Sequence, residues 1–172
     1  MQSYRPEIRE VAVHCFADGL WISGAICVPG QRALVDHLNQ GDPFLKLRKA
    51  ELAPATPFGF LALRRSAVSL VVPLLGADRV EQERPMGNFA EKSISCLLPG
   101  GTVTGRVSLL SNLRVSDHVM RAPGFLPIHD CRIHLHDSGE TLSAEPLPVA
   151  LINVHCVVGV SEPEDTSPGS TR

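Results

Sequence analysis

Long hydrophobic runs, a charge excess and paired cysteine motifs are all missing from this sequence of 172 residues. No apolar stretch approaches the ~18 residues that a membrane helix needs, and the polar segment 1–10 is unlike a signal peptide. The 16 Lys and Arg against 18 Asp and Glu lack the basic excess of a general nucleic-acid binder. The five cysteines form no C-x-x-C pair, so we expect buried, reduced thiols. These absences favour a soluble, cytoplasmic protein that does not contact a membrane.

Aromatic residues and phosphate-binding loops are also scarce. Only 5% of the chain is aromatic, with one Trp and one Tyr, so we expect no aromatic platform for stacking nucleic-acid bases. The segment Pro99-Gly100-Gly101 is typical of a hairpin turn and does not match a strand-to-helix phosphate cradle. We therefore expect no cofactor and no small-molecule substrate.

A repeat is the main feature that the sequence does have. Residues 11–52 match the residues 81 positions further along the chain without a gap. Self-similarity at a fixed offset predicts two copies of one small domain. The identities between the copies are Cys15/Cys96, Gly19/Gly100, Gly24/Gly105, Asp36/Asp117, His37/His118, Phe44/Phe125 and Leu45/Leu126.

Each copy has the pattern of a small antiparallel β domain with one short helix. In copy one we expect strands at 10–16 and 20–28 with a bend at Gly24, and a helix around residues 34–38. In both copies the third strand changes its alternation of apolar residues at the same place, which predicts a bulge and a strongly bent strand. The segments 62–74 and 149–160 are each typical of two short strands joined by a tight turn. The predicted organisation is a domain at 9–76, a linker at 77–90, a second domain at 91–160 and a disordered tail at 161–172.

Copy one resembles an Sm-like barrel through residues 11–16, the turn Asp18-Gly19, and residues 22–26, 44–47 and 65–73. Copy two is similar through residues 103–107 and 153–158, and its residues 114–128 also resemble an uncharacterised bacterial small-domain family. The resemblance implies an all-β fold of two tandem Sm-like or SH3-like five-stranded barrels. In both copies the short loop of Sm proteins between strands two and three is replaced by a longer segment with a helix, 29–43 in copy one.

Three groups of residues are candidates for chemistry. His129, Asp130, His134, His136 and Asp137 include a His-x-His pair of the kind that binds metals, but the strand parity turns these side chains to solvent. Copy one lacks such a cluster, so we favour a solvated strand face, with a metal or ligand site at His134 and His136 as an alternative.

The pairs Asp36-His37 and Asp117-His118 occur in both copies. Adjacent residues point apart on a helix, and no Ser or Cys nucleophile accompanies both pairs. We expect the aspartates to cap or anchor the short helices and not to take part in acid–base catalysis.

Arg64 and Arg65 form the third group, because the resemblance places them where the bacterial Sm-like RNA chaperone contacts RNA. Asn153 is the corresponding residue of copy two. Together these three are the candidate contacts with RNA or a protein partner. Since no catalytic or metal-binding constellation stands out, we expect a non-enzymatic interaction or scaffold module that binds a protein partner or itself. The alternative is an RNA-binding Sm-like protein.

Overall fold

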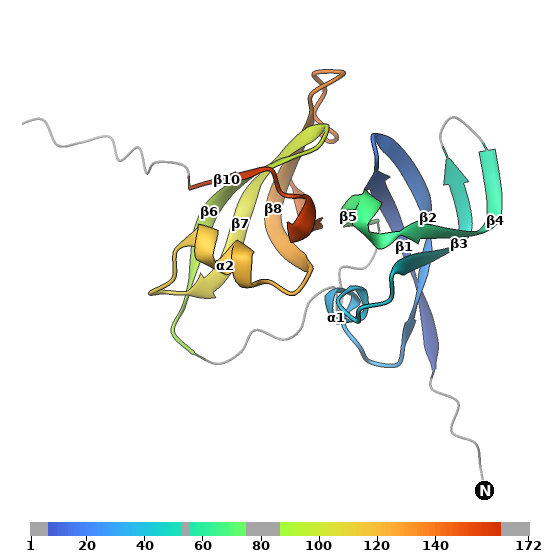
Figure 1. Ribbon diagram of the computed structural model, residues 1–172, viewed down its shortest axis with the longest axis horizontal. Coiled ribbons are helices and arrows are strands. Elements are labelled where there is room, and N and C mark those ends of the chain that lie inside the picture. The colour runs from blue at the N-terminus through green and yellow to red at the C-terminus, as the bar shows by residue number, and fades with distance from the viewer. Residues whose placement is uncertain (1–6, 53–55, 75–86, 163–172) are drawn as a thin grey trace, which may run out of the picture.

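The protein is all-β, and the ten strands of its described residues form one antiparallel sheet. The computed structural model describes residues 7–52, 56–74 and 87–162 (Figure 1). The strand order is β10-β6-β7-β8-β9-β5-β1-β2-β3-β4. The first half contains β1 (Ile8–Ala17), β2 (Leu20–Pro29), α1 (Leu34–Leu38), β3 (Phe44–Leu52), β4 (Thr56–Arg64), the 3-10 turn η1 (Arg65–Ala67) and β5 (Val68–Pro73). The second half contains β6 (Phe89–Leu98), β7 (Gly101–Leu110), α2 (Val115–Arg121), β8 (Phe125–Leu135), β9 (Leu147–Asn153), the 3-10 turn η2 (Val154–Cys156) and β10 (Gly159–Ser161).

The two halves repeat one another element by element. From the first strand to the start of the third, counterpart elements begin 81 residues apart, as the sequence predicted. The loop after β8 is longer than the loop after β3, so in the fourth strand and the following 3-10 turn the offset is 89 residues. Below, counterparts are the residues related by these two offsets.

The predicted bend in the second and third strands is confirmed in both halves. The pairing of β2 with β3 shifts register between Ser23 and Ala25, and Lys49 on β3 has a φ of 50°. Gly24 lies at this bend, where a Cβ atom would be 3.2 Å from the Arg48 carbonyl oxygen. At the counterpart Gly105 the contact would be only 2.6 Å, to the carbonyl oxygen of His129. Glycine therefore lets the two strands approach closely enough to bend together.

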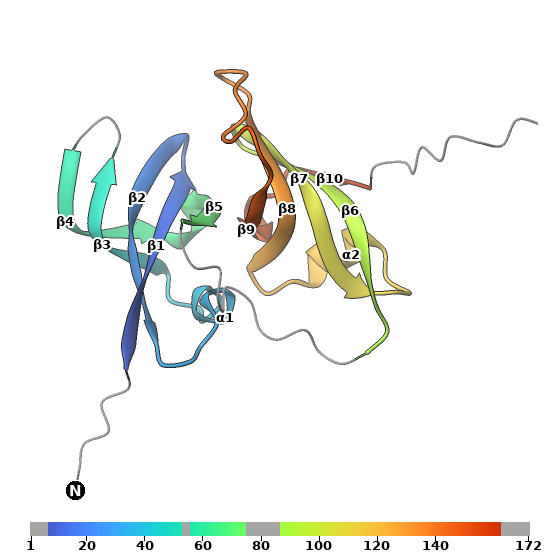
Figure 2. The same ribbon diagram turned by 180° about the vertical axis from the view of Figure 1, so that it is seen from behind.

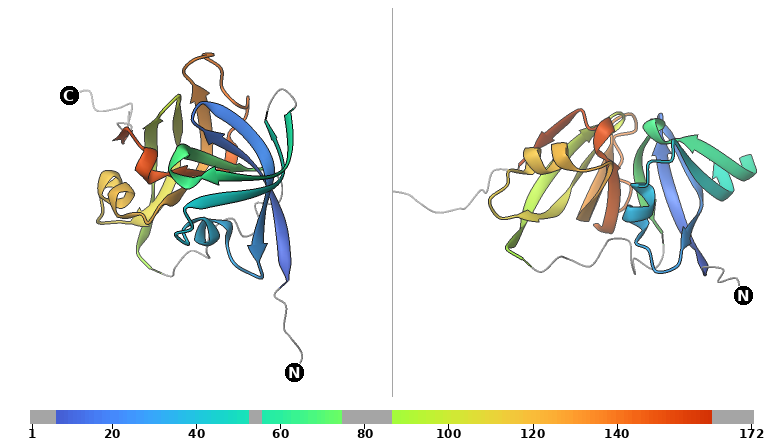
Figure 3. Two further views of the ribbon diagram at one scale, coloured as in Figure 1. Left: turned by 45° about the vertical axis from the view of Figure 1, so that its right-hand side comes forward. Right: turned by 60° about the horizontal axis from the view of Figure 1, so that its bottom comes forward.

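The halves are joined by hydrogen bonding between β5 and β9, which lie side by side in the middle of the molecule (Figure 2). Their register pairs Leu70 with Ile152 and Val71 with Leu151. Each half is strongly curled (Figure 3), but the sheet is continuous through this junction. The all-β class is confirmed, whereas the arrangement as two separate Sm-like barrels is not.

Side-chain packing also joins the two halves. The core of the first half includes three residues of the second half, Phe125, Val149 and Leu151. The core of the second half in turn includes Phe16, Leu70 and Val72 of the first half. The junction, as the term is used below, is the paired strands β5 and β9 together with these shared core residues. A marginal small domain gains apolar burial by such sharing.

The structure describes only parts of the predicted linker and of the predicted tail. β6 begins at Phe89, inside the predicted linker, and residues 77–86 of that linker lie outside the described residues. β10 ends at Ser161, and most of the predicted tail (163–172) also lies outside them. Neither helix in the described part of the chain is long and apolar enough to cross a membrane.

Candidate functional site

The predicted contact residues come together at the junction. Arg64 ends β4 and Arg65 begins η1, while Asn153 ends β9 next to η2, and the two 3-10 turns are in contact. These residues border an open pocket of about 500 Å³ that both halves build. The lining is Pro43, Phe44, Arg64, Arg65, Ser66, Asn153 and His155. Arg64 and Arg65 thus share one surface with Asn153, which is distant from them in the sequence, and no acidic side chain is among the lining residues.

Asn153 holds the junction together. Its side chain is 2% exposed, and its amide nitrogen donates to the carbonyl oxygens of Val68 at 2.9 Å and Arg65 at 3.2 Å. Its side-chain oxygen accepts a hydrogen bond from the backbone N–H of His155 at 3.2 Å. Both amide hydrogens are therefore used within the protein. Asn153 is better described as a lock between β5 and β9 than as a ligand contact.

The two arginines have different surroundings. The Arg65 side chain is partly buried, and its Nε donates to the backbone carbonyl of Asp42. Burial is the main reason why the pKa of Arg65 lies below its usual value. Arg64 is exposed, as is His155 on the other side of the pocket. An anion at this pocket would therefore meet Arg64 first.

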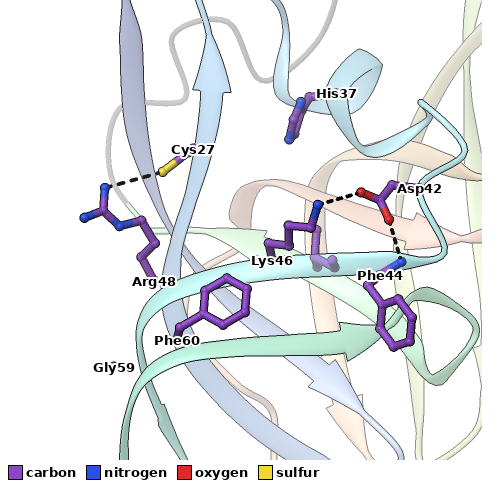
Figure 4. A pocket seen from close by; sticks show the side chains of 9 residues that line it. Cys27, His37, Asp42, Phe44, Lys46, Arg48, Gly59 and Phe60 are labelled. Carbon is purple, nitrogen blue, oxygen red and sulfur yellow. Dashed lines mark hydrogen bonds and ion pairs between the residues drawn. The ribbon is translucent and has the colours of Figure 1, made fainter.

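A second pocket of about 350 Å³ lies between α1, β3 and β4 (Figure 4). The Lys46 Nζ is 3.0 Å from the Asp42 carboxylate, and an Arg48 guanidinium nitrogen is 3.2 Å from that of Glu10. These cations are thus already paired with acids. The Phe60 side chain extends from β4 toward β3, and Phe44 borders both pockets (Figure 4).

Three phenylalanines are exposed in spite of the low aromatic content, and the sequence analysis did not predict this. Phe60 is 59% exposed, Phe44 42% and Phe58 36%, all on β3 and β4. The sequence analysis missed Phe58 and Phe60 because it began the fourth strand at Ala62, whereas β4 begins at Thr56. The alternation of Phe58 and Phe60 is the signal that would have found this strand.

The Asp-His pairs do not cap the helices. The N-cap positions are Ala33 and Arg114, neither of which makes a capping side-chain bond, and the aspartates lie in the first turn instead. The backbone N–H of Val115 at the start of α2 is bound by the Glu162 carboxylate at 2.8 Å. The helix register places Asp36 and Asp117 in the first turn, three residues after the N-cap positions.

The histidines of these pairs are partly buried. Burial lowers the pKa of both His37 and His118. At His37 the nearby cations Arg32 and Arg65 lower the pKa further. The His37 Nδ1 is buried, and no hydrogen-bond partner for it occurs among the described residues. Both rings are therefore favoured in the neutral form.

The histidine cluster of β8 follows the predicted strand face. Cys131 and Ile133 are buried, while His134 is exposed. The His134 and His136 rings are 6.3 Å apart, and the His136 Nε2 is 2.8 Å from the Thr102 hydroxyl. Asp130 pairs with Arg106. Within the described residues, no group of three or more His, Cys, Asp or Glu side chains is placed to hold a metal.

The two ends of the sheet are the remaining candidate surface. Among the described strands, β4 pairs only with β3, and β10 pairs only with β6. Each therefore presents an open edge (Figure 1). Comparison with models of known families, with curated proteins and with solved structures finds no match to this chain.

Proposed function

We propose that this protein is a non-enzymatic interaction module that binds protein through the open edges of its sheet. The observation that carries the proposal is the β4 edge, a nine-residue strand with exposed phenylalanines and a single described neighbour. The free N–H and C=O groups of such an edge pair readily with another strand. Edge strands are usually protected by charge, so exposed apolar side chains favour a covering partner.

The thiols support a non-enzymatic role. Burial raises the pKa of Cys15 to about 12 and those of Cys96 and Cys131 to about 11. A thiol acts as a nucleophile in its thiolate form, so these three cysteines are inert near neutral pH. Neutral, partly buried His37 and His118 lie on helices without a neighbouring nucleophile fixed in both halves.

The test is to purify the protein under native conditions, measure the mass of its complexes and identify any second chain. The partner is then purified, and its affinity is measured for the unchanged protein and for Phe60→Lys. We expect Phe60→Lys to weaken binding by about tenfold or more, because it places a charge at the edge contact. Leu110→Lys, at another exposed apolar position, is the matched control. A protein that is strictly monomeric and carries no partner contradicts the proposal.

A second candidate function is RNA binding by an Sm-like protein. It is supported by the convergence of Arg64, Arg65 and His155 on a pocket with Phe44 at its rim. Phosphate contacts by cations and base stacking on an aromatic ring are the usual basis of single-strand binding. The glycine bend in each second strand is in keeping with the Sm-like resemblance.

RNA binding is tested with A-rich and U-rich oligonucleotides at several salt concentrations. We expect Arg64→Ala and Phe44→Ala to weaken binding, and Arg121→Ala, an exposed arginine on α2, to leave it unchanged. Arg64→Ala should also reduce the salt dependence, because one phosphate contact is lost. If no binding occurs even at low salt, this candidate function is rejected.

A further inference from the structure

The junction joins two different strands of the repeat. β5, the fifth strand of the first half, pairs with β9, the fourth strand of the second half. The strands left at the two ends of the sheet are β4, the fourth strand of the first half, and β10, the fifth strand of the second half. The two outer strands of the sheet are therefore one fourth strand and one fifth strand, the same two kinds that pair at the junction.

We propose that a second copy of this chain is the partner, and that β10 of one molecule pairs with β4 of the next in the geometry of the junction. This inference rests on the proposed function, because it identifies the protein that binds the open edges as a second copy of the chain. Such a contact is head-to-tail: the two molecules use different surfaces, and each keeps one end free for a further copy.

The junction also specifies the register of this contact. Within the chain, Leu70 lies opposite Ile152 and Val71 opposite Leu151. Replacing each residue by its counterpart places Gly159 of one molecule opposite Leu63 of the next, and Val160 opposite Ala62. Both predicted pairs lie within the observed strands β10 and β4.

Exposed side chains of the first half support the proposal. The junction buries three second-half residues in the core of the first half, with exposed fractions of 2% for Phe125, 5% for Val149 and 0% for Leu151. Their counterparts all lie on the surface. These are Phe44, 42% exposed, Phe60, 59% exposed, and Ala62, also exposed. The phenylalanines that are unusual for a free surface thus occupy the positions that a neighbouring copy would cover.

The β10 end of the molecule also exposes the counterparts of residues that act at the junction. Asn39, next to α1, holds the start of β8 by hydrogen bonds to the backbone N–H and carbonyl of Phe125, at 2.6 and 3.0 Å. Its counterpart is Met120, which lies within α2 and is 83% exposed. In the proposed contact, Met120 of one molecule meets Phe44 of the next. Methionine sulfur packs favourably against aromatic rings.

Phe16 provides a second comparison at that end. It is 7% exposed, belongs to the core of the second half and fills the space above Gly100. The counterpart Leu97 is 40% exposed. The counterpart of Gly100 is Gly19, which has no atom within 4 Å of the place where its Cβ would lie. A neighbouring copy would bring Leu97 to this open space.

The intermolecular contact should be weaker than the junction. The predicted register contains two residue pairs, as the junction does, so the difference lies in the short β10 strand with its partly exposed residues and in the side chains. Arg64 also occupies the place of the buried lock Asn153, and a guanidinium costs more to bury than an amide. We therefore expect reversible association that depends on protein concentration.

Two double variants test the head-to-tail geometry. Leu97→Lys with Met120→Lys changes only the β10 end, and Phe44→Lys with Phe60→Lys changes only the β4 end. Light scattering coupled to gel filtration should show association of the unchanged protein at high concentration, and a monomer for each double variant. We expect association to weaken by about tenfold or more in each case. Leu110→Lys should associate like the unchanged protein.

The decisive measurement is the mixture of the two double variants. Each retains the end that the other has lost, so the mixture should form a one-to-one dimer and nothing larger. Recovery of the dimer also shows that both variants are folded. A mixture that remains monomeric overturns the head-to-tail geometry, and an unchanged protein that remains monomeric at all concentrations overturns self-association. If that monomer still binds a different protein through β4, the proposed function stands while this inference fails.

Discussion

Replacing Asn153 by alanine tests how strongly the junction holds the two halves together. The substitution removes the hydrogen bonds to the carbonyl oxygens of Val68 and Arg65. The Val68 bond is buried, so its loss should cost ~1–2 kcal/mol, and the partly buried Arg65 bond ~0.5–1 kcal/mol. We therefore expect Asn153→Ala to lower the free energy of unfolding by about 1.5–3 kcal/mol.

The assay is urea unfolding followed by circular dichroism, together with the thermal midpoint. A loss of this size should lower the midpoint by ~3–12 °C for a chain of this length. Asn112→Ala, at an exposed turn position, is the matched control and should change stability by less than ~0.5 kcal/mol. If Asn153→Ala unfolds like the control, Asn153 does not lock the junction, and the importance given to the β5–β9 contact is wrong.

Three further outcomes are expected. Gly105→Ala should destabilise the protein by ~2–4 kcal/mol, and Gly24→Ala should destabilise it by less. The reason is that the new Cβ would lie 2.6 Å from a carbonyl oxygen at Gly105 but 3.2 Å from one at Gly24. Equal losses of stability in urea unfolding would contradict this prediction. The Cys15 thiol, with its pKa raised to about 12, should react with a thiol reagent only at the rate of unfolding, and mass spectrometry of early labelled peptides would show any faster reaction. The folded state lowers the pKa of His37 and His118, so the unfolded state binds more protons just below pH ~6.5. Stability should therefore fall on acidification through that range and be independent of these two groups above it. The double variant His37→Gln with His118→Gln should show a smaller dependence of the free energy of unfolding on pH.

Local pattern was sufficient to predict the repeated unit. The gap-free match, the glycine at each second-strand bend and the change of parity in each third strand all reflect contacts between neighbouring strands of one half. The bend at Gly24, for example, depends on Leu47 and Arg48, which are close in the same unit. Such short-range contacts leave a periodic trace in the sequence.

The junction left a trace that was interpreted too simply. Residues 68–72 of β5 are all buried, although a strand with one solvated face would alternate. A short, continuous apolar run is typical of a strand covered on both faces. The sequence therefore indicated that β5 lies between two packed layers, but not that β9 was its neighbour, because the choice of a distant strand has no local signal.

The candidate contacts were predicted as a set, but their roles were not. Arg64, Arg65 and Asn153 do border one pocket, whereas the burial of Asn153 and the anchoring of Arg65 depend on how the halves meet. The exposure of Phe44 and Phe60 also has no local signal, because their counterparts Phe125 and Val149 are buried where the halves meet.

The divergence of the two fifth strands bears on why the chain contains two copies. β5 is apolar on both faces, and Asn153 locks it to β9, which suits a permanent contact. β10 has only three residues, and none of them is fully buried. If the two units once met through equal surfaces, covalent linkage allowed one of the contacts to become part of the core, while the other stayed exposed and short. The exposed phenylalanines on β4 are then expected to serve reversible assembly, and their replacement by lysine should impair assembly without lowering the stability of the single chain.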